Sequence, residues 1–458
     1  MNTTLNLNKK NLFESAPILK AVISLVLPTI LSQLITVVYN MADTFYIGQL
    51  GDPNQVAAST IAMPIFMMLT GIANLFGVGG ASLISRSLGN SNYKRAKHTS
   101  SFCIYVSSII AIVYGLTVLF IKPVVLPLLG TDEYTYGYTS IYLLWTVTIG
   151  ALPTVLSMLL AHLVRSEGYS KEASIGLSLG GLLNIALDPL FIFVFKLEIQ
   201  GAAIATMLSN LVATAFFIIF LIRKRKTTVI NFSIKNVTFK DSIPKEVVMV
   251  GFTSFIMAVM GTFSNMVLNG IMASYSNQAI AGMGIAKRID LLAYAIAHGM
   301  TQGVLPLIAY NYASGNKKRM TDTIKITIIL SLIVAVASTL LLYFCATPVT
   351  RLFIDDDLTV SYGRDFLKII ALACPITMIN NVAITVFQAI GRKVRPLILS
   401  ISRKGVTDIP VMFMFNSLIG VSGIPWAVPT AEGIGLIFSM IFIILLLKNL
   451  KKTPTQKV

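Results

Sequence analysis

Long apolar runs recur along the whole chain, and they constrain its fold more than any single motif does. A helix needs about 20 consecutive apolar residues to cross the hydrocarbon core of a bilayer, and short polar breaks separate runs of at least this length. The pattern is typical of a polytopic helical membrane protein. We predict twelve spans, near residues 17–41, 55–84, 96–121, 135–164, 172–195, 200–223, 244–275, 278–312, 320–346, 361–390, 395–417 and 423–447.

The composition agrees with a chain that is mostly embedded in lipid, since 55% of its residues are hydrophobic and only 12% are charged. The stretch MNTTLNLNKKNLFES before the first span is polar and shows no cleavable signal peptide. The cysteines have no paired spacing, so neither a disulfide framework nor a metal site is expected from Cys103, Cys345 and Cys374.

The net charge of +17 reflects topology rather than nucleic acid binding, because the basic residues are confined to alternate loops. If the N-terminus is cytoplasmic, roughly 29 of the 36 lysine and arginine residues fall on the inner side. The acidic tract Asp355-Asp356-Asp357 then falls outside. The positive-inside rule therefore predicts that both termini are cytoplasmic.

The basic run at 223–245 is the only substantial linker, and it divides the chain into halves. We expect an N-terminal lobe at 1–222, a cytoplasmic linker at 223–243 and a C-terminal lobe at 244–458. The linker is a topogenic inner loop in the simpler interpretation. In the alternative, it binds anionic lipid, at about 1 kcal/mol for each basic residue near the surface.

The two halves resemble each other at an offset of about 222 residues. GQLGDPNQVAA at 48–58 recurs as GIMASYSNQAIA at 270–281, and ALPTVLSMLLAHLVRSEG at 151–168 recurs as ACPITMINNVAITVFQAIG at 373–391. An even number of spans keeps both repeats in the same orientation. We therefore predict an all-α membrane protein with two six-helix bundles, related by a pseudo-two-fold axis along the membrane normal. Such duplication is typical of secondary transporters, although it also occurs in membrane proteins that transport nothing.

Polar chemistry is concentrated in the fifth span, where Asn184 and Asp188 lie four residues apart and so share one helix face. An ionised group at the centre of a bilayer helix costs roughly 2.5–3.5 kcal/mol, which makes an intramembrane aspartate a candidate functional residue. Pro189 lacks an N–H and leaves the carbonyl of Ile185 without its helical partner. These oxygens suit a proton or a hard cation such as Na⁺. The alternative is a proline-kinked helix whose aspartate only bonds Asn184.

Two further residues reach a similar depth in the outer half of the membrane. Thr206 comes about five residues into the sixth span, and Asp43 ends the first span, which Pro28 can bend. Asp43, Asn184, Asp188 and Thr206 are therefore expected to share one site in the N-terminal half. The alternatives are a water-facing helix end for Asp43 and a back-bonded helix threonine for Thr206.

Three motifs together resemble one transporter family. They are DTxxxGxLG beginning at Asp43, Asn-x-x-x-Asp-Pro beginning at Asn184, and Gly-Ala-Ala-x-Ala-Thr ending at Thr206. With twelve spans in two halves, the chain looks like the multidrug and toxic compound extrusion (MATE) family, and specifically its DinF-like prokaryotic branch. The resemblance implies a location in the prokaryotic plasma (inner) membrane.

The resemblance also implies a cation-binding site in the N-terminal lobe, mapped onto Asp43, Asn184, Asp188 and Thr206, with the backbone carbonyl of Ala202 as a further ligand. Other branches of the family carry a carboxylate in the seventh span. This sequence has Asn265 and Asn269 there instead, which puts a C-lobe cation site of that kind in doubt.

The C-terminal half nevertheless carries charges of both signs at mid-depth, namely Lys287, Arg288, Asp290, Lys404, Asp408 and Glu432. Unpaired charges at such depth are costly. We therefore expect Arg288 to pair with Glu432 or Asp408 and to hold the helices of this lobe together. The alternative is a second proton-coupling site.

Aromatic and methionine side chains are candidates for a cavity that binds flat apolar cations, because aromatic faces attract cations and thioethers adapt to varied shapes. The candidates are Tyr39, Phe66, Met67, Trp145, Met257 and Met260. His162, near the inner end of the fourth span, is expected to be a packed or headgroup-facing residue rather than a proton relay.

The sequence therefore predicts an antiporter that exports organic, cationic amphiphiles in exchange for H⁺ or Na⁺. The alternative is a flippase or exporter of a lipid-linked or other amphiphilic metabolite, which needs a basic cavity to hold phosphate groups. HExxH and GxSxG motifs are absent from the sequence, so we do not expect an enzyme. We expect small-molecule substrates and the lipid bilayer as partners, no nucleic acid, no cofactor besides the coupling ion, and a monomer.

Overall fold

The computed structural model describes residues 7–452, and every regular element within this range is helical. Within residues 7–452, ten helices are long and apolar enough to cross a membrane. Two further pairs of helices pass the same test together, each bent at a short break. Counting each bent pair as one span gives twelve, which confirms the number predicted from the apolar runs.

The N-terminal bundle contains the first six spans. Its elements are α1 (Leu7–Glu14), α2 (Ile18–Gly48), α3 (Pro53–Gly89), α4 (Tyr93–Leu128), α5 (Thr135–Leu143), η1 (Leu144–Ile149), α6 (Ala151–Ser166), α7 (Ser170–Pro189), η2 (Leu190–Val194) and α8 (Glu198–Arg223). A connection that includes η3 (Ile234–Asn236) then leads to the second bundle.

The C-terminal bundle contains the other six spans. Its elements are α9 (Ile243–Ala273), α10 (Asn277–Ala313), α11 (Lys317–Phe344), α12 (Ala346–Arg351), α13 (Asp357–Ala371), α14 (Cys374–Ala389), α15 (Val394–Arg403), α16 (Asp408–Ile419), η4 (Gly420–Ser422), η5 (Ile424–Trp426) and α17 (Ala427–Lys452).

The internal repeat is visible in the two bent spans. The fourth span bends by 50° before Ala151, and the tenth bends by 44° before Cys374. These positions are 223 residues apart (374 − 151), close to the offset of the sequence repeat. A proline follows each break, at Pro153 and at Pro375, within the first turn, where a missing N–H costs least.

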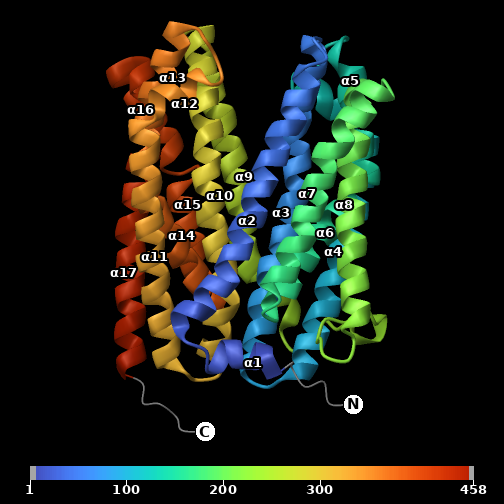
Figure 1. Cartoon of the computed structure of the whole chain (residues 1–458), viewed down its shortest axis with the longest axis vertical. Coiled ribbons are helices and arrows are strands. Elements are labelled where there is room, and N and C mark those ends of the chain that lie inside the picture. Colours follow the sequence, from blue (N-terminus) through green and yellow to red (C-terminus); the bar gives the residue numbers. More distant parts are fainter. Residues whose placement is uncertain (1–6, 453–458) are drawn as a thin grey trace.

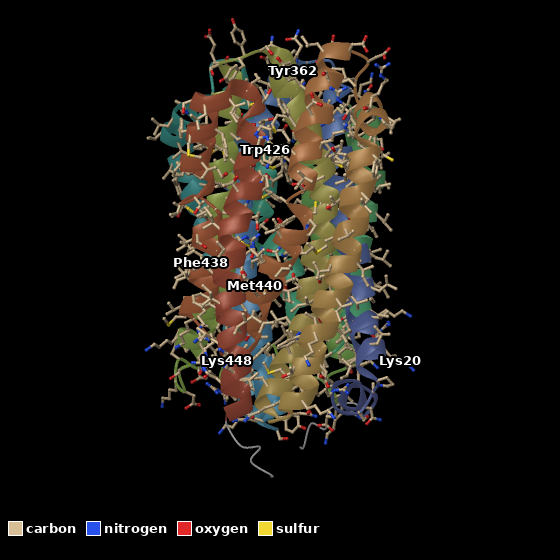
Figure 2. The ribbon with its side chains drawn as sticks, turned by 90° about the vertical axis from the view of Figure 1, so that its left-hand side faces the viewer. Lys20, Tyr362, Trp426, Phe438, Met440 and Lys448 are labelled. Carbon is tan, nitrogen blue, oxygen red and sulfur yellow. The ribbon has the colours of Figure 1, made fainter. Side chains whose placement is uncertain are left out.

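The two bundles lie side by side and diverge toward the top of Figure 1. The short helix α1 and the carboxyl end of α17 both lie at the bottom. Figure 2 places Lys20 and Lys448 toward this same end, and Tyr362 and Trp426 toward the other. Between them, Phe438 and Met440 are 37% and 47% exposed, as expected for side chains that face lipid.

The bundles are joined by close packing and by ion pairs. At Gly251 of α9, a Cβ atom would lie 1.7 Å from the carbonyl oxygen of Leu75 in α3, so only glycine allows this approach. Glu246 of α9 bonds Arg86 of α3 at 3.0 Å and Arg95 of α4 at 2.6 Å. The linker ends at α9, whose first residue, Ile243, is three positions before Glu246, so this contact lies at the linker end of the molecule.

Linker residues pack back onto the N-terminal bundle through Glu167, which follows α6 directly. The carboxylate of Glu167 accepts hydrogen bonds from the Thr228 hydroxyl at 2.7 Å and from the Val229 N–H at 2.5 Å. Burial raises the pKa of Glu167 from 4.5 to about 7, although both hydrogen bonds act in the opposite direction. This carboxyl group therefore titrates near neutral pH.

We expect the stability of the protein to fall between pH 5 and pH 8 because of Glu167. Folding raises the pKa of this carboxyl group, so its contribution to stability is fully present below pH 4.5, which is its pKa in the unfolded chain. This contribution is lost as the pH rises through about 7, its pKa in the folded protein. The free energy of unfolding should fall by on the order of 2 kcal/mol over this pH interval. The measurement is the unfolding midpoint in detergent against pH. The Glu167→Gln variant should show a smaller decline, and equal slopes for both proteins would contradict the assignment.

Candidate functional site

Three of the polar residues predicted to form a site come together between α7 and α8. The side-chain amide of Asn184 donates to Asp188 Oδ1 at 3.1 Å and to Thr206 Oγ1 at 3.4 Å. Asn184 is 1% exposed, Asp188 is 0% and Thr206 is 8%. The i, i+4 spacing on α7 and the antiparallel return of α8 thus produce a buried polar cluster inside an apolar bundle.

The local chain path follows from Pro189. It ends α7, and the helix continues as the π-helical turn η2 because a proline cannot donate the next intrahelical hydrogen bond. Gln55 of α3 then fixes the start of α8, accepting from the Ile199 N–H at 3.0 Å and donating to Glu198 at 2.8 Å. Gln55 is 3% exposed and was not among the predicted site residues. It positions the helix that carries Thr206.

Asp43 of α2 is the fourth member of this group, which we call the acidic cluster (Asp43, Asn184, Asp188 and Thr206). Asp43 and Asp188 interact electrostatically, and both also interact with Tyr142 of α5. Tyr39, one turn before Asp43, interacts with both acids as well. The structure therefore brings together the two carboxylates that the sequence placed on different spans.

Close packing of α2 against α7 holds this arrangement. At Gly181, a Cβ atom would lie 2.9 Å from Tyr39 Cδ1, so the tyrosine ring lies directly on the glycine. Gly181 and Asp188 are two turns apart on α7 and fall on the same side of the helix. Helix α2 is continuous through Pro28.

Several oxygen atoms of the acidic cluster are buried and have no hydrogen-bond partner among the described residues. They are Asp43 Oδ1, Asn184 Oδ1 and Asp188 Oδ2. Each such atom is costly in an apolar interior unless something satisfies it. Two carboxylates and an amide oxygen form an oxygen-only donor set, which fits a proton or a hard monovalent cation.

Ala202, predicted as a backbone ligand, is fully buried in a small apolar group with Ile47, Ile192 and Ile199. Ala202 lies on α8 one turn before Thr206. Its proposed carbonyl contact to an ion stays a prediction.

The charges of the C-terminal bundle pair differently from the predicted arrangement. Arg403, not Arg288, binds Glu432, with Nη2–Oε1 at 2.8 Å and Nε–Oε2 at 2.7 Å. Both partners of this pair are 2% exposed. Asp408 instead accepts hydrogen bonds from the Ser264 hydroxyl at 2.6 Å and the Gly405 N–H at 2.5 Å. The expected pairing of Arg288 with Glu432 or Asp408 is wrong, because Arg288 is exposed on α10.

A break in the eleventh span explains this difference. α15 ends at Arg403 and α16 begins at Asp408, with Gly405 at φ +85 between them. A left-handed residue stops the helical repeat, so Lys404 and Asp408, although four residues apart in sequence, are not one turn apart on a single helix. The break leaves Arg403 at the end of α15 beside α17, where it meets Glu432.

The candidate cavity residues separate into groups. Met67 and Met257 line a cavity in the C-terminal bundle, and Met260 lies against Gly405. Phe66 packs against the main hydrophobic core, and Trp145 is half-buried within η1. Tyr39 lies next to the acidic cluster and does not line this cavity.

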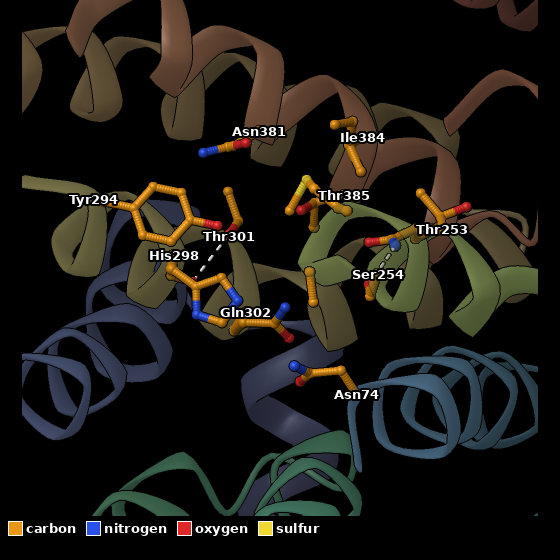
Figure 3. A pocket seen from close by; sticks show the side chains of 13 residues that line it. Asn74, Thr253, Ser254, Tyr294, His298, Thr301, Gln302, Asn381, Ile384 and Thr385 are labelled. Carbon is orange, nitrogen blue, oxygen red and sulfur yellow. Dashed lines mark hydrogen bonds between the residues drawn. The ribbon is translucent and has the colours of Figure 1, made fainter. Parts of the chain in front are cut away.

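A second, polar cavity lies between the bundles, as Figure 3 shows. Asn74 of α3 approaches it from one side and Asn381 of α14 from the other, with His298 and Gln302 of α10 between them. The ring of His298 stacks on Tyr294 with centroids 6.0 Å apart. Sequence reasoning missed this cavity. The only available signal in the sequence was that Tyr294, His298 and Gln302 follow one another at intervals of four residues on α10.

His162 of α6 lies close to this region. It is 6% exposed, and its Nε2 atom lies 3.2 Å from Asn74 Oδ1. The structure thus places it as a packed side chain with one hydrogen-bond partner, as expected for a residue that fills an interior position.

Known proteins resemble this chain along nearly its whole length. A profile of the family described as MatE matches residues 28–190 and 253–414. Two proteins called multidrug export protein MepA are similar. The one from Staphylococcus saprophyticus is 34% identical, and the one from Staphylococcus aureus (strain MRSA252) is 33% identical. Both alignments cover 95% of this chain and 95% of the relative.

Solved structures share the fold. A crystal structure of MATE in the straight conformation has a TM-score of 0.91 at 22% identity and covers 98% of this chain and 100% of that one. The outward-facing conformation of a multidrug resistance MATE family transporter has a TM-score of 0.89 at 22% identity, with the same coverage.

Proposed function

The chain belongs to the MatE family, and from this premise we propose that it is a secondary antiporter that exports organic, cationic amphiphiles in exchange for H⁺ or Na⁺. One observation carries the proposal. The buried Asp188 and the half-buried Asp43 interact electrostatically, and one carboxylate oxygen of each, together with Asn184 Oδ1, is buried without a partner within the described residues. Two such acids cannot both stay ionised cheaply, so the cluster takes up a proton or a cation.

Ion uptake changes the charge between α2 and α7. Because Tyr39 lies on Gly181, a shift of α2 relative to α7 moves side chains that face both Asp43 and Asp188. Pro28 has no N–H and therefore donates no intrahelical hydrogen bond of its own. The helix α2 bends at this position without breaking another backbone hydrogen bond. In this mechanism the bound ion bends the helix and releases the exported compound outward.

We assign the end that carries α1 and the linker to the cytoplasm, because the basic residues gather there. The protein is then closed toward the cytoplasm, with Glu246 bonded to both arginines. Residues 1–222 and 244–458 move as two lobes about the linker at 223–243. The protein acts as a monomer in a prokaryotic plasma membrane.

The stoichiometry decides which gradient drives export. Exchange of one monovalent ion for one monovalent drug is electroneutral, so the chemical gradient of the ion supplies the energy. A second ion would add about 2.3 kcal/mol for each 100 mV of membrane potential.

The proposal is tested by drug accumulation in cells that express the chain. Accumulation should stay low until an ionophore collapses the ion gradient, and export that is insensitive to every ionophore would contradict antiport.

Replacing Glu246 by Gln should open the cytoplasmic side more often. The two ion pairs are 16–29% exposed, so together they contribute about 1–2 kcal/mol to the closed state. A cysteine introduced at Ser82, whose hydroxyl bonds the Gln388 carbonyl across the contact, should then react with a maleimide about five- to thirtyfold faster.

The matched control for Glu246→Gln is Asp241→Asn. Asp241 is an exposed carboxylate nearby in the linker without an ion pair among the described side chains. Labelling should not change in this variant. Equal rates in the Glu246→Gln variant and the control would show that the two ion pairs do not hold the lobes closed.

A further inference from the structure

The largest cavity described in the C-terminal bundle measures about 530 Å³, which is the size of a site for a drug-like molecule. We call it the basic chamber. Residues of α9, α10, α11, α13, α14, α15, α16 and α17 contribute to its lining, and apolar side chains such as Leu268, Met283 and Met412 form much of its wall. Met67 of α3 also lines it. The chamber therefore reaches the interface with the N-terminal bundle.

The charged groups of the basic chamber do not balance. Glu432 is bound by Arg403, and Asp408 accepts hydrogen bonds from Ser264 and from the backbone. Within residues 7–452, the cationic groups of Lys287, Arg288 and Lys404 have no acidic oxygen within 4.0 Å. Asp408 keeps its negative charge, because its hydrogen-bond donors are neutral. Beyond the Arg403–Glu432 pair, three cations thus face two acids, Asp290 and Asp408, and one positive charge is in excess.

Asp290 lies one turn from Lys287 on α10. It interacts electrostatically with both Lys287 and Lys404. The two lysines come from different helices and repel each other. Asp290 and Asp408 offset part of this repulsion, and the excess positive charge in an apolar cavity favours a further anion.

The broken eleventh span is a second, independent sign of a ligand site. Irregular backbone at membrane depth is tolerated only where it is buried in protein or lines a cavity, and discontinuous helices often form the binding sites of transporters. The break at 404–407 places Lys404 on the wall of the basic chamber. A cation at the carboxyl end of α15 also balances the helix dipole, but this does not explain Lys287, which lies inside α10.

We propose that the basic chamber binds an anionic group of an amphiphile, with Lys287 and Lys404 as its ligands and the apolar wall around its hydrophobic body. The inference rests on the proposed export function and extends it. A carboxylate or phosphate bridges two ammonium groups well, because charge-assisted hydrogen bonds strengthen in a low dielectric. Since the acidic cluster of the other lobe attracts positive charge, the transporter is suited to zwitterionic amphiphiles as well as cations.

The test uses two rhodamine dyes that differ only in one group, a free carboxylic acid and its methyl ester. Their binding to the purified full-length protein is measured by fluorescence anisotropy. In the double variant Lys287→Gln with Lys404→Gln, the Kd of the acid should rise about tenfold or more, while the Kd of the ester stays within about twofold. Kd values that change equally for both dyes, or for neither, would overturn the proposal.

Two controls keep the result interpretable. The variant Lys287→Arg with Lys404→Arg retains both charges and should bind the acid nearly as tightly as the original protein does. Lys448→Gln removes an exposed lysine of α17 and should have no effect. If the original protein exports neither dye along an ion gradient but its acid binding still depends on the lysines, the proposed export function fails and the basic chamber stands.

The source of the anion is resolved in lipid nanodiscs. Phosphatidylglycerol carries a phosphate on an apolar body, so it competes with the acid dye if the chamber takes a lipid headgroup. Competition that the double lysine variant abolishes would assign the site to a lipid. Acid binding that is the same in phosphatidylcholine alone and with phosphatidylglycerol would assign it to a small exported molecule.

Discussion

The Asp188→Asn variant is expected to lose ion-driven efflux, by at least tenfold, while the protein stays folded. Asparagine has nearly the same shape as aspartate and can still accept a hydrogen bond from Asn184, whose amide lies 3.1 Å from Asp188 Oδ1. It carries no charge and takes up no proton near neutral pH. The variant therefore removes the chemistry of the acidic cluster without removing its packing.

Efflux from preloaded cells and the unfolding midpoint of the purified protein measure this outcome together. The matched control is Glu133→Gln, an exposed acid in the loop before α5, and it should transport normally. A folded Asp188→Asn protein that still exports in response to an ion gradient would remove Asp188 from the coupling site.

The Glu432→Gln variant is expected to lose stability rather than transport. Arg403 and Glu432 are both 2% exposed, and Asn380 and Asn381 bond them from α14 at 2.9 and 3.0 Å. Removing one charge of a buried pair leaves the other uncompensated and typically costs about 3–5 kcal/mol. The unfolding midpoint in detergent should fall accordingly, while efflux at low temperature stays close to that of the original protein.

A double variant separates charge balance from the loss of any particular side chain. Arg403→Met with Glu432→Leu removes both charges together, and it should recover most of the stability that the single change loses. If Glu432→Gln instead abolishes ion coupling at unchanged stability, the pair is a second coupling site and not a structural element.

The part of the acidic cluster formed by Asn184, Asp188 and Thr206 was predictable because its signals are local. Asn184 and Asp188 are four residues apart on one helix, and Thr206 enters the next span at the same depth. Helical periodicity and the rise of 1.5 Å per residue are enough to bring such residues together. The contact of Tyr39 with Gly181 was not predictable, because it depends on how α2 packs across α7.

The C-terminal bundle shows where this reasoning fails. A continuous apolar pattern over 395–417 predicts one regular helix, which would put Lys404 and Asp408 one turn apart. The left-handed Gly405 breaks the helix and turns Arg403 toward Glu432. Glycine alone does not predict such a break, since most glycines in these spans have ordinary helical angles.

The polar cavity between the bundles was missed for a related reason. Asn74 and Asn381 are more than 300 residues apart in sequence, and they meet across it only because α3, α10 and α14 pack together. Single-sequence periodicity describes which face of a helix is polar. It does not describe which other helix that face meets.

Transport in proteoliposomes tests the central claim most directly, which is that Asp43 and Asp188 together take up the coupling ion. Efflux of a cationic dye is measured at one fixed pH while an inward gradient of Na⁺ is varied, and again at fixed Na⁺ with an inward proton gradient. One of the two gradients should accelerate efflux by the original protein and have no effect on Asp43→Asn or Asp188→Asn. Acceleration that persists in both variants would contradict the claim.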